Sequence, residues 1–265
     1  SDVCSSDLLR ARLEDGAERV VPLAAGSDPA AMRECGIVFI FVKSYATRTA
    51  AADIAPHLKE GTIVVSLQNG LGNREILARE LPGARLVYGT TTTGGYKDGA
   101  GSVVLGGLGE IVIGSGDDTA LAAARGLLEK AGLAITITPN PEEAVWKKAL
   151  INAGINPLGA LSGLENGKII ENEHLATLME SIIREGAAAA SAEGVSLDPD
   201  EMIETALQVC ARTARNRCSM LQDLDAGRHT EIDSINGHII RTGLKHGIRS
   251  PFNEAVYRLV KSREG

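Results

Sequence analysis

The feature that most constrains the fold is an apolar run, IVFIFV, from Ile37 to Val42. Consecutive β-branched and aromatic residues predict a strand buried on both faces, as in a parallel sheet. The segment TIVVSL, residues 62–67, predicts a second such strand, and helical segments follow at 47–58 and 74–80. Further strands are expected at 85–95 and 134–139, and two short strands within 101–116. A helix is expected over 119–131. This alternation predicts an α/β layer with a mostly parallel sheet.

The pattern changes at Pro141, where the sequence NPEE gives a helix start signal. The remaining residues are helical in period, with turns at ENGK, SLDPDE and HGIRSP. We therefore expect an α/β domain over residues 1–139 and an all-helical domain over residues 140–265.

Charge and cysteine content narrow the classes of function. The formal net charge of −7 disfavours a nucleic-acid partner, because a phosphate backbone needs a basic face. Cys4, Cys35, Cys210 and Cys218 form no CxxC pair, which argues against a zinc site and favours free thiols in a reducing cytoplasm. We expect no metal, no membrane-spanning helix and no signal peptide, since no apolar run approaches the roughly 18 residues of a membrane helix.

Two polar residues follow neighbouring predicted strands. Lys43 comes directly after the run Ile37–Val42, and Asn69 follows the second strand. Each alone is most often a solvated loop residue. Because the carboxyl ends of strands in an open α/β sheet form the ligand crevice, the two together favour a cofactor groove.

The segment WKKALINAGINPLGALSGLENG places polar residues at helical spacing in an apolar stretch. Lys148, Asn152 and Asn156 are four residues apart and form one slowly rotating stripe, and Asn166 follows. A solvated helix face is one interpretation, although such faces usually favour Glu, Lys and Arg. Alternatively, the amides could bind a hydroxy or keto acid, and a lysine with a pKa lowered by burial could supply a proton.

A third region, SMLQDLDAGRHTEIDSINGHII, contains Glu231 ahead of an apolar helical face that includes Ile232, Ile235 and Ile239. We expect Glu231 in the first turn of this helix, where a carboxylate complements the helix dipole. The order of polar residues in SMLQDL has no obvious structural explanation.

Taken in order, these motifs resemble the ketopantoate reductase (2-dehydropantoate 2-reductase) family. The set consists of Lys43, QNGLGN with Asn69, GTTT, the Lys148 segment and NRCSMLQDLDAGRHTEIDSINGHII with HGIRSPFN. It covers the chain from about Asp28 to the C-terminus. Each motif alone is weak, whereas the ordered set with these spacings is specific.

The resemblance implies a Rossmann-like domain joined to a helical domain of the 6-phosphogluconate dehydrogenase C-terminal type. It implies NADPH-dependent reduction of 2-dehydropantoate to (R)-pantoate, on the route to coenzyme A. The active site would lie in the cleft between the domains, and the resemblance allows a homodimer. Lys148 matches the general acid, and Glu231 matches the carboxylate that orients the cofactor ribose and supports the lysine. The matching substrate contacts are Asn152, Asn156, Asn166, Asn216 and Ser219. The matching cofactor contacts are Lys43, Asn69 and Gly95, together with Glu231.

The chain departs from the family at its start. It holds no G-x-G-x-x-G phosphate loop, and NGLGN and GGLGE lack the spacing and the strand-to-helix context. The family's first strand, first helix and second strand are absent or replaced, so a preference for NADPH over NADH rests on the resemblance alone. We expect the chain as given to be unstable and to bind nicotinamide cofactor poorly, and its first eight residues not to be native.

Two other functions remain open. β-Hydroxyacid dehydrogenases also place a Lys and an Asn four apart on a helix after a Rossmann domain, and close paralogues could reduce other 2-keto acids. The chain could also be an inactive remnant that serves as a binding module.

Overall fold

The computed structural model describes residues 8–13 and 15–264, so Cys4 lies outside the described residues. Contacts divide the chain into two units. The first unit contains Ser1–Phe41, Arg48–Leu67 and Leu77–Pro139. The second unit contains Asn140–Gly265 and two short segments from earlier in the chain, Val42–Thr47 and Gln68–Ile76. Each of these short segments carries one of the predicted cofactor contacts, Lys43 or Asn69.

The first unit contains a five-stranded sheet with the order β3-β4-β5-β8-β9. Its strands are β3 (Ile37–Ile40), β4 (Ile63–Ser66), β5 (Arg85–Thr91), β8 (Ile111–Gly114) and β9 (Ile135–Ile137). Three neighbouring pairs are parallel, and only β5 and β8 run antiparallel. The prediction of a mostly parallel α/β sheet is therefore confirmed.

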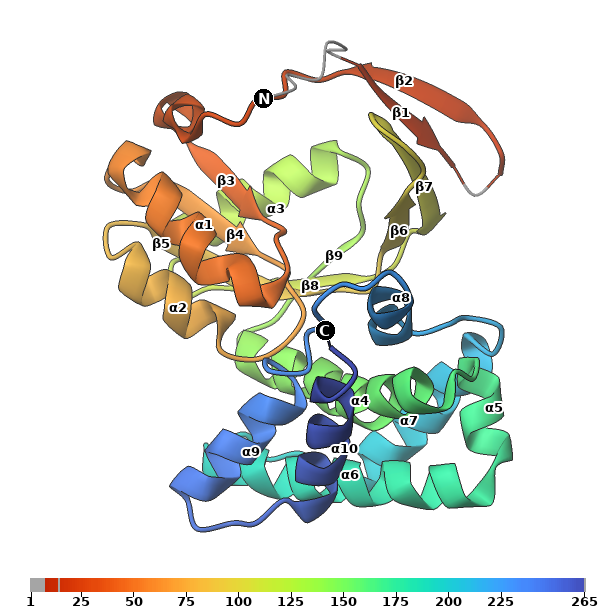
Figure 1. Ribbon diagram of the computed structural model, residues 1–265. Helices are drawn as coiled ribbons and strands as arrows, with labels where there is room; N and C mark the ends of the chain where they lie inside the picture. Colours follow the sequence, from red (N-terminus) through yellow and green to blue (C-terminus); the bar gives the residue numbers. More distant parts are fainter. Residues whose placement is uncertain (1–7, 14, 265) are drawn as a thin grey trace. The chain divides into compact units, whose positions relative to one another are not determined.

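Helices cover both faces of this sheet (Figure 1). On one face α3 (Asp118–Lys130) packs against side chains that include Ile63 and Val65. On the other face α1 (Thr47–Ile54) and α2 (Asn73–Glu80) pack against Val64 and its neighbours. Because successive side chains of β4 point to opposite faces, its continuous apolar sequence is explained by burial on both sides. Two short 3-10 helices lie in this unit, at Pro29–Glu34 and Ala55–His57, and a third, Ser44–Ala46, lies in the short segment Val42–Thr47 of the second unit.

A second, four-stranded sheet has the order β2-β1-β7-β6. Its strands are β1 (Leu8–Arg12), β2 (Glu18–Pro22), β6 (Gly94–Lys97) and β7 (Ser102–Gly107). The sequence pattern predicts no strand before Ile37, whereas β1 and β2 form an antiparallel hairpin there. Gly16, with φ +81°, lies in the turn, and Leu13 N–H donates to the carbonyl of Ala17 at 2.8 Å. Both strands are largely exposed, so burial imposes no clear hydrophobic alternation on their sequence.

Among the described residues, seven α-helices lie wholly within the second unit (Figure 1). They are α4 (Pro141–Ser162), α5 (Asn166–Glu171), α6 (Glu173–Ala192), α7 (Pro199–Arg212), α8 (Ser219–Asp225), α9 (Asn236–Lys245) and α10 (Pro251–Lys261). Asn140 caps α4 by accepting from Glu143 N–H, and Gly163, with φ +73°, ends it. Helix α4 packs against α5, α6, α7, α8 and α10, so it forms the centre of the apolar core.

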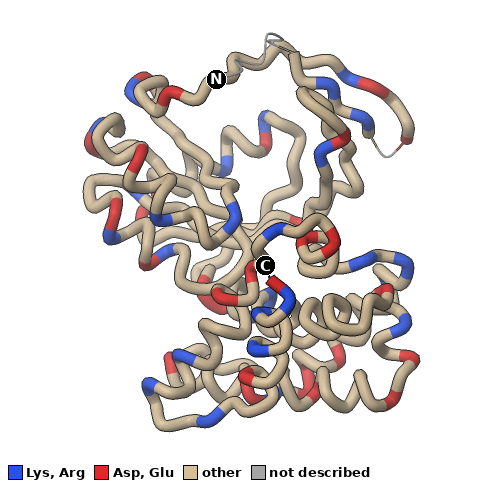
Figure 2. Tube along the Cα trace, viewed as in Figure 1, with Lys and Arg blue, Asp and Glu red and all other residues tan. Residues whose placement is uncertain are grey.

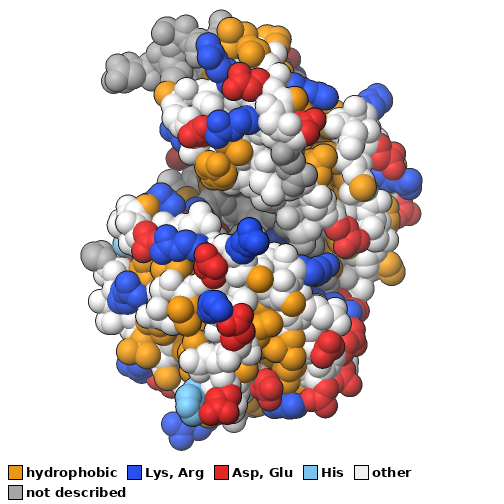
Figure 3. Space-filling model, turned by 90° about the vertical axis from the view of Figure 1, so that its right-hand side faces the viewer, with side chains coloured by type: hydrophobic (Ala, Val, Ile, Leu, Met, Phe, Trp, Pro, Cys, Tyr) orange, Lys and Arg blue, Asp and Glu red, His pale blue; other side chains and the backbone are white. Residues whose placement is uncertain are grey.

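Charged side chains of both signs are interspersed along the chain (Figure 2). The face in Figure 3 likewise mixes acidic, basic and hydrophobic side chains. Within residues 8–13 and 15–264, none of the helices has the length and apolar character needed to cross a membrane. The same described residues contain no group of three or more His, Cys, Asp or Glu side chains arranged to hold a metal ion.

Candidate active site

Lys148 lies on the central helix α4, in a turn where Trp146 and Ala149 are buried. Its side chain is partly buried. Burial lowers the pKa of the Lys148 ammonium to about 8, and the nearby carboxylate of Glu231 opposes this shift. A lysine with this pKa is still mostly protonated near neutral pH, yet it releases its proton far more easily than a solvated lysine.

The amides of the predicted stripe differ in exposure. Asn152 is partly buried, whereas Asn156 and Asn166 are buried. Asn166, the first residue of α5, donates from Nδ2 to Thr213 Oγ1 at 2.8 Å. Its buried Oδ1 has no hydrogen-bond partner among the described residues. A buried amide oxygen without a partner is costly in a folded protein, and a donor on a bound ligand would satisfy it.

Glu231 is buried, but it does not lie in the first turn of a helix as expected. Helix α9 begins at Asn236, and Ile235, with φ −103° and ψ −95°, separates it from the turn that carries Glu231. The helix-dipole explanation for Glu231 was therefore wrong. Its carboxylate instead accepts hydrogen bonds from Ser44 in the loop after β3.

The two carboxylate oxygens of Glu231 have different partners. Oε1 accepts from the backbone N–H of Ser44 at 3.1 Å and from its hydroxyl at 2.9 Å. Oε2 lies 3.4 Å from Asn69 Nδ2 and 3.7 Å from Lys43 Nζ. The structure thus brings Lys43, Asn69 and Glu231 together within the second unit, and the carboxylate of Glu231 also acts electrostatically on Lys148.

Asp223 is a member of this cluster that the sequence did not reveal. It lies on α8, its side chain is only 4% exposed, and its Oδ2 is 2.6 Å from Lys43 Nζ. Its other oxygen accepts from Arg228 Nε at 3.0 Å. The order of residues in SMLQDL now has a partial explanation, since it places a buried carboxylate where it fixes the Lys43 ammonium.

Side-chain hydrogen bonds hold the two short loop segments of the second unit against each other. Gln68 Nε2 donates to the carbonyl of Val42 at 2.7 Å and to Thr47 Oγ1 at 2.8 Å. The second loop also binds the Glu231 turn, because Leu71 N–H donates to the carbonyl of Ser234 at 2.7 Å. Gly70 is needed here, since a Cβ at that position would lie 2.4 Å from Ser234 Oγ.

Three further predicted residues lie apart from these contacts. Asn216 and Ser219 are exposed, and Asn216 contributes its carbonyl oxygen to Asn166 N–H at 3.0 Å. Ser219 is the first residue of α8. Gly95 lies on β6 in the first unit and is exposed. Their roles in binding remain predictions.

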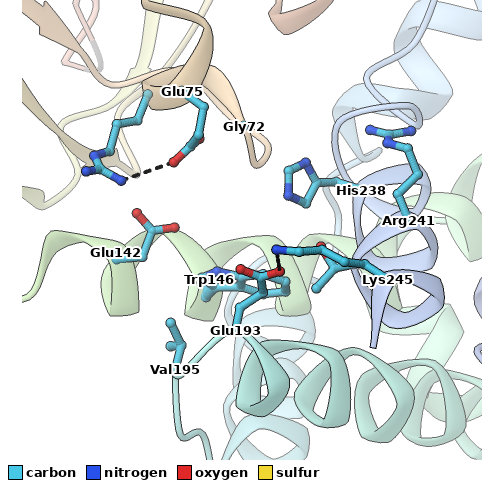
Figure 4. A pocket seen from close by; sticks show the side chains of 11 residues that line it. Gly72, Glu75, Glu142, Trp146, Glu193, Val195, His238, Arg241 and Lys245 are labelled. Carbon is cyan, nitrogen blue, oxygen red and sulfur yellow. Dashed lines mark hydrogen bonds and ion pairs between the residues drawn. The ribbon is translucent and has the colours of Figure 1, made fainter. Parts of the chain in front are cut away.

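A pocket of about 430 Å³ opens elsewhere in the second unit (Figure 4). Trp146 and His238 pack edge to face in its wall, with ring centroids 6.2 Å apart, and burial lowers the pKa of His238. Four of the charged lining residues form two ion pairs, Arg74 with Glu75 at 3.1 Å and Lys245 with Glu193 at 2.7 Å. The predicted site residues are not among those that line it; the lining consists of Gly72, Arg74, Glu75, Glu142, Trp146, Glu193, Val195, His238, Arg241, Thr242 and Lys245.

Comparison with known proteins identifies the scaffold that carries this cluster. The family profile described as ketopantoate reductase PanE/ApbA matches residues 4–118, and that of its C-terminal part matches residues 140–264. The 2-dehydropantoate 2-reductase of Halobacterium salinarum is 36% identical over 258 residues, covering 96% of this chain and 84% of the relative. The chain belongs to the ketopantoate reductase family. The resemblance seen in the sequence is thereby confirmed.

Other relatives agree with this assignment. The 2-dehydropantoate 2-reductase of Archaeoglobus fulgidus is 34% identical, covering 87% of this chain and 77% of the relative. Among solved structures, a PanE/ApbA family ketopantoate reductase from Ralstonia eutropha matches with a TM-score of 0.89 and 32% identity, covering 97% and 84% of the two chains. A D-mandelate dehydrogenase bound to NADH and anilino(oxo)acetate matches with the same TM-score and coverage at 27% identity.

Proposed function

We propose that this chain carries the active site of an NADPH-dependent reductase that converts 2-dehydropantoate to (R)-pantoate. One observation carries the proposal: within a ketopantoate reductase scaffold, the partly buried Lys148, with a pKa of about 8, is electrostatically coupled to the buried carboxylate of Glu231. Reduction of a ketone places negative charge on its oxygen. An ammonium aimed at that oxygen stabilises the charge and donates the proton, so Lys148 is assigned as the general acid.

The cluster around Glu231 fits the ribose end of a nicotinamide cofactor. Glu231 Oε2 is an acceptor for a ribose hydroxyl, while Asn69 and Lys43 offer an amide and a cation beside it. Gly95 is assigned as a further cofactor contact. When bound, a nicotinamide cofactor would supply the hydride for the reduction, since no side chain can do so. Membership of the family and the NADH-bound dehydrogenase support a nicotinamide cofactor, and NADPH is the more specific part of the proposal.

The substrate is assigned to the amide stripe. Asn152, Asn156 and Asn166 can donate from Nδ2 and accept at Oδ1, which suits the hydroxyl and carboxylate of a hydroxylated 2-keto acid. The unpartnered Oδ1 of Asn166 is the acceptor available for a substrate hydroxyl. Asn216 and Ser219 are assigned as additional substrate contacts near α5 and α8.

A second candidate follows from the structural match to D-mandelate dehydrogenase. That enzyme was solved with NADH and an aromatic keto-acid analogue, and its fold matches this chain with a TM-score of 0.89. On this alternative the chain would act on a 2-keto acid with an aromatic side chain and would use NADH.

The test is to supply 2-dehydropantoate with NADPH to the gene product that carries this sequence, and to follow loss of the reduced cofactor's absorbance. Chiral chromatography of the product should show (R)-pantoate. Phenylglyoxylate with NADH serves as the parallel assay for the alternative. Turnover of phenylglyoxylate without turnover of 2-dehydropantoate would reject the proposal in favour of the second candidate.

A further inference from the structure

Ser44 and Ser234 form a chain of hydroxyl groups that ends on the carboxylate of Glu231. Ser44 Oγ lies 2.9 Å from Glu231 Oε1 and 2.7 Å from Ser234 Oγ. Ser44 is itself buried, and Ser234 is partly buried. All three residues belong to the second unit, although Ser44 comes from the loop after β3 and the other two from the turn before α9.

Which hydroxyl of this hydrogen-bonded pair donates and which accepts follows from the partners available to each. An ionised carboxylate can only accept, so the hydroxyl proton of Ser44 points to Glu231 Oε1. Ser44 Oγ is then an acceptor toward Ser234. The other acceptor near Ser234 Oγ is the carbonyl oxygen of Glu231 at 3.0 Å, which already accepts the backbone N–H groups of Ser234 and Ile235, each at 3.1 Å. We therefore infer that the hydroxyl of Ser234 donates its proton to Ser44 Oγ.

Backbone contacts hold both serines of this hydroxyl chain in place. Ser44 also donates its backbone N–H to Glu231 Oε1 at 3.1 Å, so that oxygen receives two donors from one residue. At the other end, the carbonyl of Ser234 accepts from Leu71 N–H, and Ser234 Oγ lies only 2.4 Å from the position that a Cβ on Gly70 would take. With Oε1 bound in this way, Oε2 is the carboxylate oxygen that remains beside Asn69 and Lys43.

We propose that Ser44 is a positioning residue for the reduction, and that the Ser234 hydroxyl acts through it to fix which oxygen of Glu231 faces the reactants. This inference rests on the proposed function for its kinetic consequence, but not for the hydrogen bonds themselves. Truncation of Ser44 to Ala removes the hydroxyl donor and leaves Oε1 with the backbone N–H of residue 44 alone, so the geometry of the carboxylate relative to the reactants becomes less defined.

The test is a double-mutant cycle on Ser44→Ala, Ser234→Ala and the combined variant. Ala at Ser234 keeps the Cβ that packs on Gly70, so the local packing is preserved. Ser44→Ala is expected to lower kcat about tenfold, corresponding to roughly 1.4 kcal/mol, with little change in KM for the keto acid. Ser234→Ala is expected to lower kcat about threefold, and the combined variant should be no slower than Ser44→Ala. Ser181→Ala on α6, whose hydroxyl donates to the carbonyl of Thr177, is the matched control and should leave kcat unchanged.

A second measurement does not depend on turnover. Amide exchange of Ser44 followed by NMR should be about threefold faster in Ser234→Ala than in the parent protein, because the acceptor carboxylate is held less firmly. Unchanged kcat in Ser44→Ala, or losses that multiply in the combined variant, would overturn the positioning role. If the parent reduces no 2-keto acid but Ser44 exchange responds as described, the hydroxyl chain stands and the proposed function fails. If exchange does not respond, the chain itself is refuted.

Discussion

The lowered pKa of Lys148 gives a quantitative prediction for the pH dependence of the reaction. Burial lowers this pKa from 10.5 to about 8. If Lys148 donates the proton, the rate of reduction follows its protonated fraction, which is roughly nine-tenths at about pH 7 and one-tenth at about pH 9. We therefore expect kcat/KM for the keto acid to fall about tenfold as the pH rises from about 7 to about 9.

Three variants test whether Lys148 itself causes this pH dependence. Lys148→Met should lower kcat by about 10²- to 10⁴-fold, the usual contribution of a general acid. Glu231→Gln removes the carboxylate that raises the lysine's pKa, so any residual activity should be lost at lower pH than in the parent. Lys147→Met is the matched control on the same helix turn, since Lys147 pairs with Glu143 at 2.9 Å and should not affect the profile.

The assay is steady-state loss of reduced cofactor in a mixed buffer of constant ionic strength across this pH range. A parent enzyme that keeps full activity to about pH 10 would refute the lowered pKa of the proton donor. An alkaline limb that stays in place in Glu231→Gln would refute the electrostatic coupling between Glu231 and Lys148.

Three further predictions concern the supporting structure. Asp223→Asn should lower the free energy of unfolding in urea by about 1.5–3 kcal/mol and raise KM for the cofactor, because a buried charge-assisted contact is lost; unchanged values for both would contradict its role. Gly70→Ala should cost at least about 2 kcal/mol in the same urea experiment, since φ is +84° and the added Cβ meets Ser234 Oγ; a cost near zero would show that the loop relaxes. Burial raises the pKa of Cys210 to about 11, so this thiol should react with a disulfide reagent only after unfolding. The partly exposed Cys35 should react in the native protein, and prompt labelling of Cys210 would contradict its burial.

The regular parts of the fold could be predicted because their sequence patterns are strong. The apolar run at 37–42 and the segment 62–67 produce the parallel strands β3 and β4. Strand β4 is buried on both faces as predicted, whereas Ile37 and Phe39 of the edge strand β3 are only partly buried and Phe41 is exposed. The NPEE signal marks the start of α4 within one residue. The β1–β2 hairpin was missed because its strands are largely exposed. The Asp-Gly pair at residues 15–16 is a hairpin signal that could have revealed it.

The cluster around Glu231 was predicted only in part. Lys43, Asn69 and Glu231 could be named from strand ends and family motifs, and the structure brings them together. Asp223 and Ser44 could not, because their roles depend on contacts across 180 and 187 residues of sequence. Local patterns carry no signal for such pairs. The helix-dipole explanation of Glu231 failed for the same reason, since a long-range hydrogen bond decided the position of the carboxylate.

The central claim concerns the substrate, and a comparison of two keto acids tests it most directly. Trimethylpyruvate has the carbon skeleton of 2-dehydropantoate but lacks its hydroxyl group. A site in which the buried Oδ1 of Asn166 accepts from that hydroxyl leaves this oxygen unpaired with the analogue, so the ratio of kcat/KM values with NADPH should exceed about 100 in favour of 2-dehydropantoate. A ratio near one would show that the hydroxyl is not recognised and would contradict the assignment of this chain as a 2-dehydropantoate reductase.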